Sequence, residues 1–308
     1  MLDETAGDPM TGLKWTRKTT QKIAEQLQKI GINISRNSVG RLLSEMDFSL
    51  KVNHKKLSKG SKVTRETRNE QFLTIDRERK KFIKAGDPII SVDGKKKELI
   101  GEFKNHGTTW RQTARAVKDH DFKSESEGKA APYGVYDYQA NKGFISLGTS
   151  SETAEFAVDS IEKWWITEGN KRYPNAKNIL ILADSGGSNG CSSRLWKYEI
   201  QKKLSDQHRL TVTICHYPTG ASKWNPIEHR LFSEISKNWA GRPLESFETA
   251  LKYIRTTKTK TGLTVTARHS KKNYETGIKV TDQELAGLNL FMHPTLPKWN
   301  YKIKPTRM

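Results

Sequence analysis

Two acidic residues stand where strand-like segments end, and a third stands at the start of a helix that follows another such segment. Asp93 closes the apolar run PIISV, and Asp184 closes the apolar run ILILA just before a Ser-Gly-Gly turn. Glu228 lies in the motif NPIEH, at the start of a predicted helix that follows a third strand-like run, Thr211–Cys215. Side chains at the ends of buried strands are held firmly and remain accessible. We therefore predict that Asp93, Asp184 and Glu228 form one carboxylate site.

Three carboxylates at one site call for cations. Without cations they would repel one another, and some would take up protons. Mg²⁺ prefers oxygen ligands and keeps water and substrate phosphate in its coordination shell. Two such ions about 3.5 to 4 Å apart activate the attacking oxygen and stabilise the leaving oxygen of a phosphodiester. The predicted chemistry is therefore metal-dependent cleavage or transfer of phosphodiester bonds, with Asp93, Asp184 and Glu228 as ligands of two Mg²⁺ ions.

Each acid also has a purely structural interpretation. Asp93 precedes a glycine and can be a turn residue, and Asp184 can belong to the turn or cap the segment that follows it. The structural alternative is strongest for Glu228, because Asn225 as N-cap, Pro226 at the first helical position and Glu228 at the third form a capping arrangement. The joint placement of the three acids favours the catalytic interpretation.

Two other kinds of site are not favoured by the residues in the same region. Cys215, His216 and His229 flank one loop, but they lack the ligand spacing of a tetrahedral zinc site. Ser185 and Ser188 lie near two glycines without the GxSxG pattern of a serine hydrolase. We interpret His229 as a structural or supporting residue.

The elements predicted around the acids are a strand meander followed by alternating helices and strands. The predicted strands cover residues 88–93, 99–103, 133–138, 143–148, 179–183 and 211–215, with helices at 153–168, between the last two strands, and from 225. Such an order gives an α/β sheet with helices on its faces. The RNase H-like fold has this order, with acids at the end of its first strand, at the end of its fourth, and on a helix after its fifth. Asp93, Asp184 and Glu228 occupy these places.

A smaller helical region precedes the sheet. Apolar residues recur at helical spacing between Thr19 and Gly31, and Ser35 can cap a second short helix. Two short helices joined by a tight turn are typical of a helix-turn-helix, although any small helical hairpin has a similar pattern. The residues expected to meet DNA near the start of the second helix are Arg36, Asn37, Ser38 and Arg41.

The segment that follows is dense in lysine and arginine. Its apolar residues Leu73, Phe82 and Ile83 form a stripe, and the charges are read either as a solvated helix face or as a linker that follows DNA phosphates. Further phosphate contacts are predicted for Lys55, Lys56 and Lys223. The predicted domains are a disordered leader (1–16), a helix-turn-helix DNA-binding region (17–58), a basic helical linker (59–86) and an RNase H-like catalytic domain (87–308).

Composition limits the class of protein. The 308 residues carry a formal charge of +20, which favours a polyanionic partner such as nucleic acid over a merely soluble basic protein. The two cysteines form no CxxC pair, and no apolar run approaches the roughly 20 residues of a membrane span. The acidic, polar N-terminus is not a signal peptide. We expect a cytoplasmic protein that binds double-stranded DNA.

Long segments of the chain resemble one family. They include SVDGKKKELIGEFKN, APYGVYDYQANKGF, ILADSGGSNGCSSRLWKYEIQ and CHYPTGASKWNPIEHRLFSEISKNWAGRPL. The chain resembles the DDE transposases of bacterial insertion sequences, especially the ISAzo-thirteen type, over nearly all of residues 15–303, and NPIEH also resembles the last-acid motif of mariner-like transposases. The resemblance implies that Asp93, Asp184 and Glu228 are the DDE triad on an RNase H-like, retroviral-integrase-like core. It also implies two Mg²⁺ or Mn²⁺ ions, a homo-oligomer on DNA, a nucleoid-associated location in a bacterial cytoplasm, and cutting and joining of the DNA ends of the element.

Two departures from the family qualify these expectations. Members usually begin with roughly a hundred further residues that carry another DNA-binding part, so a truncated copy or a fragment of a split reading frame is expected here. End recognition is expected to be more affected than strand chemistry. Ser185 and Gly94 replace a more usual glycine and a slightly larger residue, and neither is expected to inactivate the triad. The main alternative function is a catalytically inactive, truncated DNA-binding relic or repressor of transposition that acts through residues 19–46. A nuclease of the same fold would share the triad but would not transfer strands.

Overall fold

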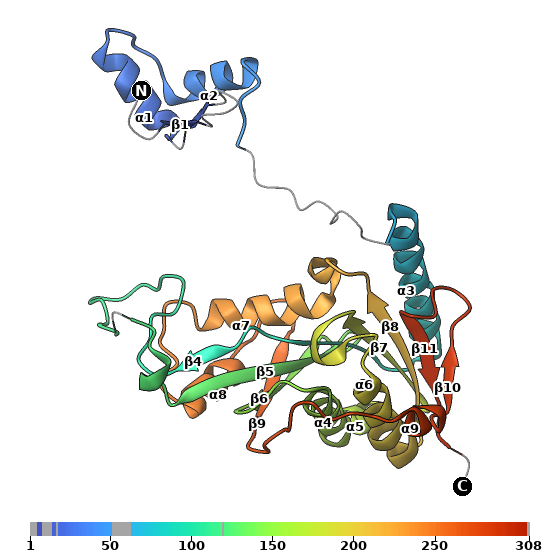
Figure 1. Cartoon of the computed structure of the whole chain (residues 1–308). Coiled ribbons are helices and arrows are strands. Elements are labelled where there is room, and N and C mark those ends of the chain that lie inside the picture. Colours follow the sequence, from blue (N-terminus) through green and yellow to red (C-terminus); the bar gives the residue numbers. More distant parts are fainter. Residues whose placement is uncertain (1–4, 8–13, 17, 51–62, 119, 307–308) are drawn as a thin grey trace. The chain divides into compact units, whose positions relative to one another are not determined.

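The computed structural model describes residues 5–7, 14–16, 18–50, 63–118 and 120–306, and the chain divides into two compact units, Met1–Lys62 and Val63–Met308 (Figure 1). Lys55 and Lys56, predicted to contact DNA phosphates, lie outside the described residues. No helix of the described part is long and apolar enough to cross a membrane.

The first unit contains the two predicted helices. They are α1 (Thr20–Lys29), capped by the Thr19 side chain, and α2 (Arg36–Glu45), capped by the Ser35 side chain as the sequence predicts. Ile23, Ala24 and Val39 are buried between the two helices. The leader was expected to be without regular structure, and this is wrong where it is described. Two short strands pair there as an antiparallel ribbon, β1 (Thr5–Gly7) and β2 (Lys14–Thr16).

The second unit is built on a mixed sheet whose nine strands belong to the described residues. Their bounds are β3 Ile89–Gly94, β4 Glu98–Ile100, β5 Gly128–Asp137, β6 Lys142–Gly148, β7 Asn178–Asp184, β8 Thr211–Tyr217, β9 Thr264–Ser270, β10 Leu290–Met292 and β11 Asn300–Ile303. The strand order is β10-β11-β8-β7-β3-β5-β6-β9, and β4 pairs with β5 outside this path.

The middle of the sheet has the topology of an RNase H-like fold. β3 pairs in parallel with β7, and β7 pairs in parallel with β8, while β5 is antiparallel to both β3 and β6. The predicted α/β sheet with its RNase H-like strand order is therefore confirmed. The chain adds strands at both edges, because β9 pairs in parallel with β6 and β11 pairs antiparallel with β8.

Helices cover both faces of this sheet. The α-helices are α3 Arg65–Ala85, α4 Ala154–Trp164, α5 Asn170–Arg172, α6 Arg194–Glu199, α7 Ser233–Asn238, α8 Phe247–Arg255 and α9 Asp282–Ala286. Three segments of wider π-helical turns adjoin them: Trp165–Gly169 links α4 to α5, Ile200–Asp206 continues α6, and Glu228–Phe232 leads into α7. The side chains Val92, Val135 and Ile181 bury one face against α4 and α6. On the other face, α7 and α8 cover β5, β6 and β9, and α3 covers β3, β7 and β8.

Helix α3 corrects the predicted basic linker of residues 59–86. It belongs to the second unit and packs on the sheet through the buried residues Gln71, Ile75 and Phe82. Leu73 and Ile83, which the sequence places in an apolar stripe with Phe82, are 55% and 47% exposed. The buried side of α3 includes polar residues, so apolar spacing alone indicates the wrong face.

The polar contact that fixes α3 is an amide pair. The Gln71 side chain donates to the main-chain oxygen of His216 at 2.8 Å and to Asn300 Oδ1 at 2.8 Å, and Asn300 Nδ2 donates to Gln71 Oε1 at 2.6 Å. Both side chains are buried. The pair therefore joins α3 to β8 and β11.

The substitution Gln71→Ala is expected to lower the free energy of unfolding of the protein by about 2–4 kcal/mol, because it leaves buried polar partners unpaired. Urea unfolding followed by tryptophan fluorescence measures this change. Leu73→Ala on the exposed side of the same helix is the matched control, and it is expected to change the free energy by less than about 0.5 kcal/mol. Equal effects of the two substitutions would contradict the role of the amide pair.

Candidate active site

The fold brings Asp93 and Asp184 side by side. Val92 of β3 and Ala183 of β7 are register partners in a parallel pair, so the next residues, Asp93 and Asp184, end the two neighbouring strands in the same row. Since side chains alternate along a strand, both acids project to the face opposite Val92, which is the face covered by α3 and α7. Glu228 enters from this face, in the first helical turn after the loop that follows β8.

The three carboxylates are close enough to change one another's ionisation. Burial raises the pKa of Asp93 to about 8, and the charges of Asp184 and Glu228 add to this effect, against the Gly94 amide, which lowers it. Burial also raises the pKa of Asp184. Burial and the charge of Asp184 raise the pKa of Glu228. Mutual repulsion of this kind is expected for carboxylates gathered to bind cations.

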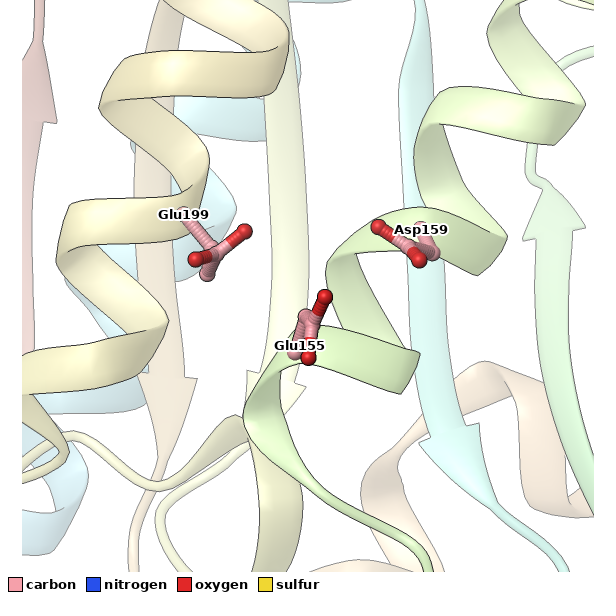
Figure 2. A group of neighbouring side chains, drawn as sticks. All are labelled: Glu155, Asp159 and Glu199. Atoms are coloured by element: carbon pink, nitrogen blue, oxygen red, sulfur yellow. The ribbon is translucent and has the colours of Figure 1, made fainter. Parts of the chain in front are cut away.

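The three acids are nevertheless less crowded than another acidic group. Within the described part of the chain, the only group of three acidic, histidine or cysteine side chains whose ligand atoms all lie within 4.8 Å of one another is Glu155, Asp159 and Glu199. Figure 2 shows these side chains facing one another, with Glu155 and Asp159 on α4 and Glu199 on α6.

Lysines already neutralise this second group. Lys203 Nζ lies 2.7 Å from Glu199 Oε2 and also binds Asp159, and Lys272 Nζ lies 2.6 Å from Glu155 Oε1 and 2.9 Å from Asp159 Oδ2. Although burial raises the pKa of Asp159, the hydrogen bonds from Lys203 and Lys272 outweigh it, and the pKa is lowered overall. The group is therefore an ion-pair network that ties α4 to α6 and to the segment after β9.

Asn225 corrects the predicted capping arrangement. Its buried amide does not cap its own helix; Nδ2 donates to Asp184 Oδ1 at 3.4 Å, and Oδ1 accepts the hydroxyl hydrogen of Ser91. The Ser91 oxygen in turn accepts the main-chain N–H of Ile227 at 3.1 Å, so the cap of the helix comes from β3. Ser91 and Asn225 thus join the strand of Asp93, the strand of Asp184 and the helix of Glu228. The sequence marked Asn225 only as a local cap.

The main chain of Asp184 is held by a buried histidine. His216 Nδ1 lies 2.9 Å from the Asp184 main-chain oxygen, and its Nε2 lies 2.9 Å from the Tyr301 hydroxyl. Burial lowers the pKa of His216 to about 4, so the neutral ring donates from Nδ1 and accepts from Tyr301. Both ring nitrogens of His216 are therefore engaged in hydrogen bonds. His229 is also engaged, because its Nε2 binds the Lys223 main-chain oxygen.

Lys95 is a basic residue at the site that the sequence did not single out. It is 9% exposed, pairs with Glu98 at 2.7 Å, and lies 4.6 Å from the centre of the Trp239 ring. Its charge lowers the pKa of Glu228, against the larger effect of burial. The run of three lysines after Asp93 was the available signal, but only one of them, Lys95, is buried.

The predicted DNA-contacting residues that the structure describes lie in different units. On α2 of the first unit, Arg36, Asn37 and Arg41 are exposed, and Arg41 lies 3.6 Å from Glu45. Ser38 donates its main-chain N–H to the cap residue Ser35 at 3.1 Å. In the second unit, Lys223 is exposed and lies 5.2 Å from the ring centre of Trp224, which is 57% exposed. Their contacts with DNA stay predictions.

The raised pKa of Asp93 predicts an unusual pH dependence in buffer that contains a chelator. Between about pH 4 and pH 8 the folded protein holds a proton on Asp93 that the unfolded chain has released, so raising the pH destabilises the folded state. We expect a loss of at most about 1.4 kcal/mol per pH unit in this window. Urea unfolding at several pH values measures it. Asp93→Asn should flatten the dependence, and an unchanged slope would contradict the assignment.

The comparisons with known proteins place the chain in a family. Residues 1–305 match the family model described as Rhodopirellula transposase DDE domain. No curated protein is found to be similar in sequence.

Several solved structures of one transposase are similar to this chain. They include the Mos1 transposase paired-end complex with left transposon end (16% identity, 77% of this chain and 65% of that chain, TM-score 0.47), the mariner Mos1 paired-end complex with Mg (16%, 77% and 65%, 0.45) and the catalytic domain of Mos1 mariner transposase (13%, 66% and 83%, 0.41). The chain thus spans slightly less than two thirds of the first of these proteins. Because the family model covers this chain almost from end to end, the protein belongs to the Rhodopirellula transposase DDE domain family.

Proposed function

We propose that the protein is a DDE-type DNA transposase that cleaves and transfers DNA strands at the ends of an insertion sequence. The observation that carries the proposal is the convergence of Asp93, Asp184 and Glu228 from three elements of an RNase H-like fold, where the charge of Asp184 raises the pKa of both Asp93 and Glu228. Family membership supports the same reaction class.

The donor set fits divalent cations. The three side chains offer only carboxylate oxygens, which are the ligands that Mg²⁺ and Mn²⁺ take, and the mutual repulsion of Asp93, Asp184 and Glu228 is relieved by positive charge. We propose that these three residues hold two such ions. When bound, the ions would activate the attacking oxygen and stabilise the leaving oxygen of the phosphodiester.

The surrounding residues of the chain hold the carboxylates in place. Asn225 donates to the Asp184 carboxylate, and His216 donates to its main-chain oxygen, so both the side chain and the backbone of this acid are fixed. Lys95 provides a buried positive charge near Glu228. We propose that hydrolysis at the end of the element frees a 3′-hydroxyl group, which then attacks a phosphodiester of the target DNA.

The proposed partner is double-stranded DNA, both the ends of the element and the target. The formal charge of +20 supports non-specific binding to phosphates, which weakens steeply with salt. Exposed Lys223 and Trp224 lie on the loop that precedes Glu228, where a cation and an aromatic ring would meet the DNA near the site of cleavage. We further propose that Arg36, Asn37, Ser38 and Arg41 contact the terminal repeat and that the protein acts as a homo-oligomer on paired ends.

The test uses the purified full chain, labelled DNA that carries the terminal repeat of the element, and Mg²⁺ or Mn²⁺. A transposase is expected to nick the repeat boundary only when the metal is present, and to join the freed 3′ end to a target plasmid. Nicking without a joined product would show a nuclease. Binding without nicking would show an inactive DNA-binding protein, and would overturn the proposal.

A further inference from the structure

A fourth carboxylate lies beside Asp93. Glu152 is partly buried in the connection between β6 and α4 and lines a cavity of about 440 Å³. A Cβ atom placed on Gly94 would lie 1.6 Å from Glu152 Oε1 and 2.7 Å from its Cδ. The carboxylate therefore fills the space against the backbone next to Asp93, and any larger residue at position 94 would displace it.

Glu152 reaches the end of β3 from the face opposite to Asp184 and Glu228. Gly94 follows Val92 by two residues, so its side-chain direction is toward the face that packs against α4. Glu152 immediately precedes the Thr153 cap of this helix. Asp93 Oδ1 accepts the main-chain N–H of Gly94 at 2.8 Å, so the carboxylates of Asp93 and Glu152 both lie against the backbone of Gly94.

No positive partner holds the Glu152 carboxylate. Among the described residues it has no hydrogen bond or ion pair, and only the charge of Lys97 acts on it from a distance, against burial, which raises its pKa. The acids on α4 and α6 differ in this respect, because Lys203 and Lys272 neutralise them. An unpaired, partly buried carboxylate next to a second acid is costly unless a cation joins them.

Tyr133 provides an independent indication that a polar ligand binds beside Glu152. It is the register partner of Gly94 on β5, so its ring lies on the same face as Glu152, and it is fully buried. Its hydroxyl group has no hydrogen-bond partner in the described structure, and its pKa is raised by burial and by the charges of Asp93 and Glu152. A buried hydroxyl group without a hydrogen-bond partner requires an explanation.

We propose that Glu152 is a fourth carboxylate ligand of the divalent-cation site and that it binds a cation together with Asp93 at the end of β3, next to Gly94. This inference rests on the proposed function, since it extends the same site. It assigns Gly94 a definite role, because the absence of a side chain there leaves the space that the Glu152 carboxylate occupies.

The test is isothermal titration calorimetry of the full chain with MnCl₂ alone, at fixed pH and salt. Glu152→Gln is expected to weaken Mn²⁺ binding at least about tenfold, as loss of a ligand or of its direct support does. Glu275→Gln is the matched control. Glu275 is an exposed acid that lines the same cavity, and its substitution should leave the affinity within about twofold.

A second variant displaces the Glu152 carboxylate without removing it. Gly94→Ala places a Cβ where Glu152 Oε1 lies, so it should weaken Mn²⁺ binding as Glu152→Gln does, and the two changes together should weaken it little further. Circular dichroism of each variant verifies folding. If Glu152→Gln does not fold, the Gly94→Ala titration decides.

Asp184→Asn separates this inference from the proposed function. If Asp184→Asn weakens Mn²⁺ binding while Glu152→Gln and Gly94→Ala behave like Glu275→Gln, the fourth ligand is refuted and the triad stands. If Asp184→Asn leaves Mn²⁺ binding unchanged, the cation site of the proposed function is refuted. Weakening by all three substitutions supports both.

Discussion

The substitution Asp93→Asn is expected to abolish metal-dependent strand cleavage, with a loss of roughly a thousandfold or more, while binding to DNA stays nearly unchanged. Asp93 is the acid most affected by its neighbours, since Asp184, Glu228 and Glu152 all act on its pKa. An amide of the same shape removes the negative charge that cations require. Several kcal/mol of transition-state stabilisation depend on those cations, and each 1.4 kcal/mol is about tenfold in rate.

Two measurements on the same protein samples test this expectation. Single-turnover cleavage of labelled repeat DNA gives the rate, and an electrophoretic mobility shift gives DNA affinity. The matched control is Asp87→Asn, which changes the same residue type just before the other end of β3, where Asp87 Oδ2 accepts a hydrogen bond from Asn178 at 3.0 Å. The control should cleave within about threefold of the unchanged protein. Normal cleavage by the Asp93→Asn protein would rule out the catalytic role of Asp93.

The second large effect is expected from Asn225→Ala, which should lower the cleavage rate about 10- to 100-fold. This range is typical when a residue that orients a metal ligand is removed. Without the amide, the Asp184 carboxylate loses a donor at 3.4 Å, and the Ser91 hydroxyl loses its acceptor. Of this hydrogen-bonded network, the bond from the Ile227 N–H to the Ser91 oxygen then remains.

A double-mutant cycle with Ser91→Ala distinguishes positioning from simple destabilisation. Because the two side chains belong to one hydrogen-bonded network, the double variant should lose less activity than the product of the two single losses. Thermal unfolding of each variant, and cleavage assays well below the unfolding temperature, remove the contribution of stability. A loss that appears only in the unfolding temperature, with cleavage and Mn²⁺ affinity unchanged, would show that Asn225 has only a structural role.

The sequence predicted the centre of the fold well because the central strands are buried on both faces. The runs PIISV and ILILA are almost continuously apolar, and such runs indicate parallel strands covered by helices. Asp93 and Asp184 could be found because each follows an apolar run at once, and Glu228 because the motif NPIEH marks the start of a helix. The helix predicted at 153–168 is confirmed for the same reason, with Ala157, Ile161 and Trp164 buried at helical spacing.

The edges of the sheet and its outer helix could not be predicted in this way. β9 alternates buried and exposed residues in a polar sequence, and β10 and β11 are short, so neither edge carries a strong pattern. α3 is buried through Gln71, whose partner Asn300 lies 229 residues away. A glutamine is indistinguishable from a solvent-facing residue until its partner is known.

The sequence by itself determined which residues could do the chemistry: three acids at the ends of apolar segments, on elements of known order, in a strongly basic chain. Only the tertiary structure decided how those acids are held and what else stands beside them. Asn225 was a local cap in the sequence and is a bridge between strands in the fold, and Glu152 carried no signal at all until β3 and α4 were brought together. The physical reason is that the spacing of apolar residues along the chain indicates which side of a helix or strand is buried. The partner of a buried polar group, in contrast, is fixed by contacts between distant segments.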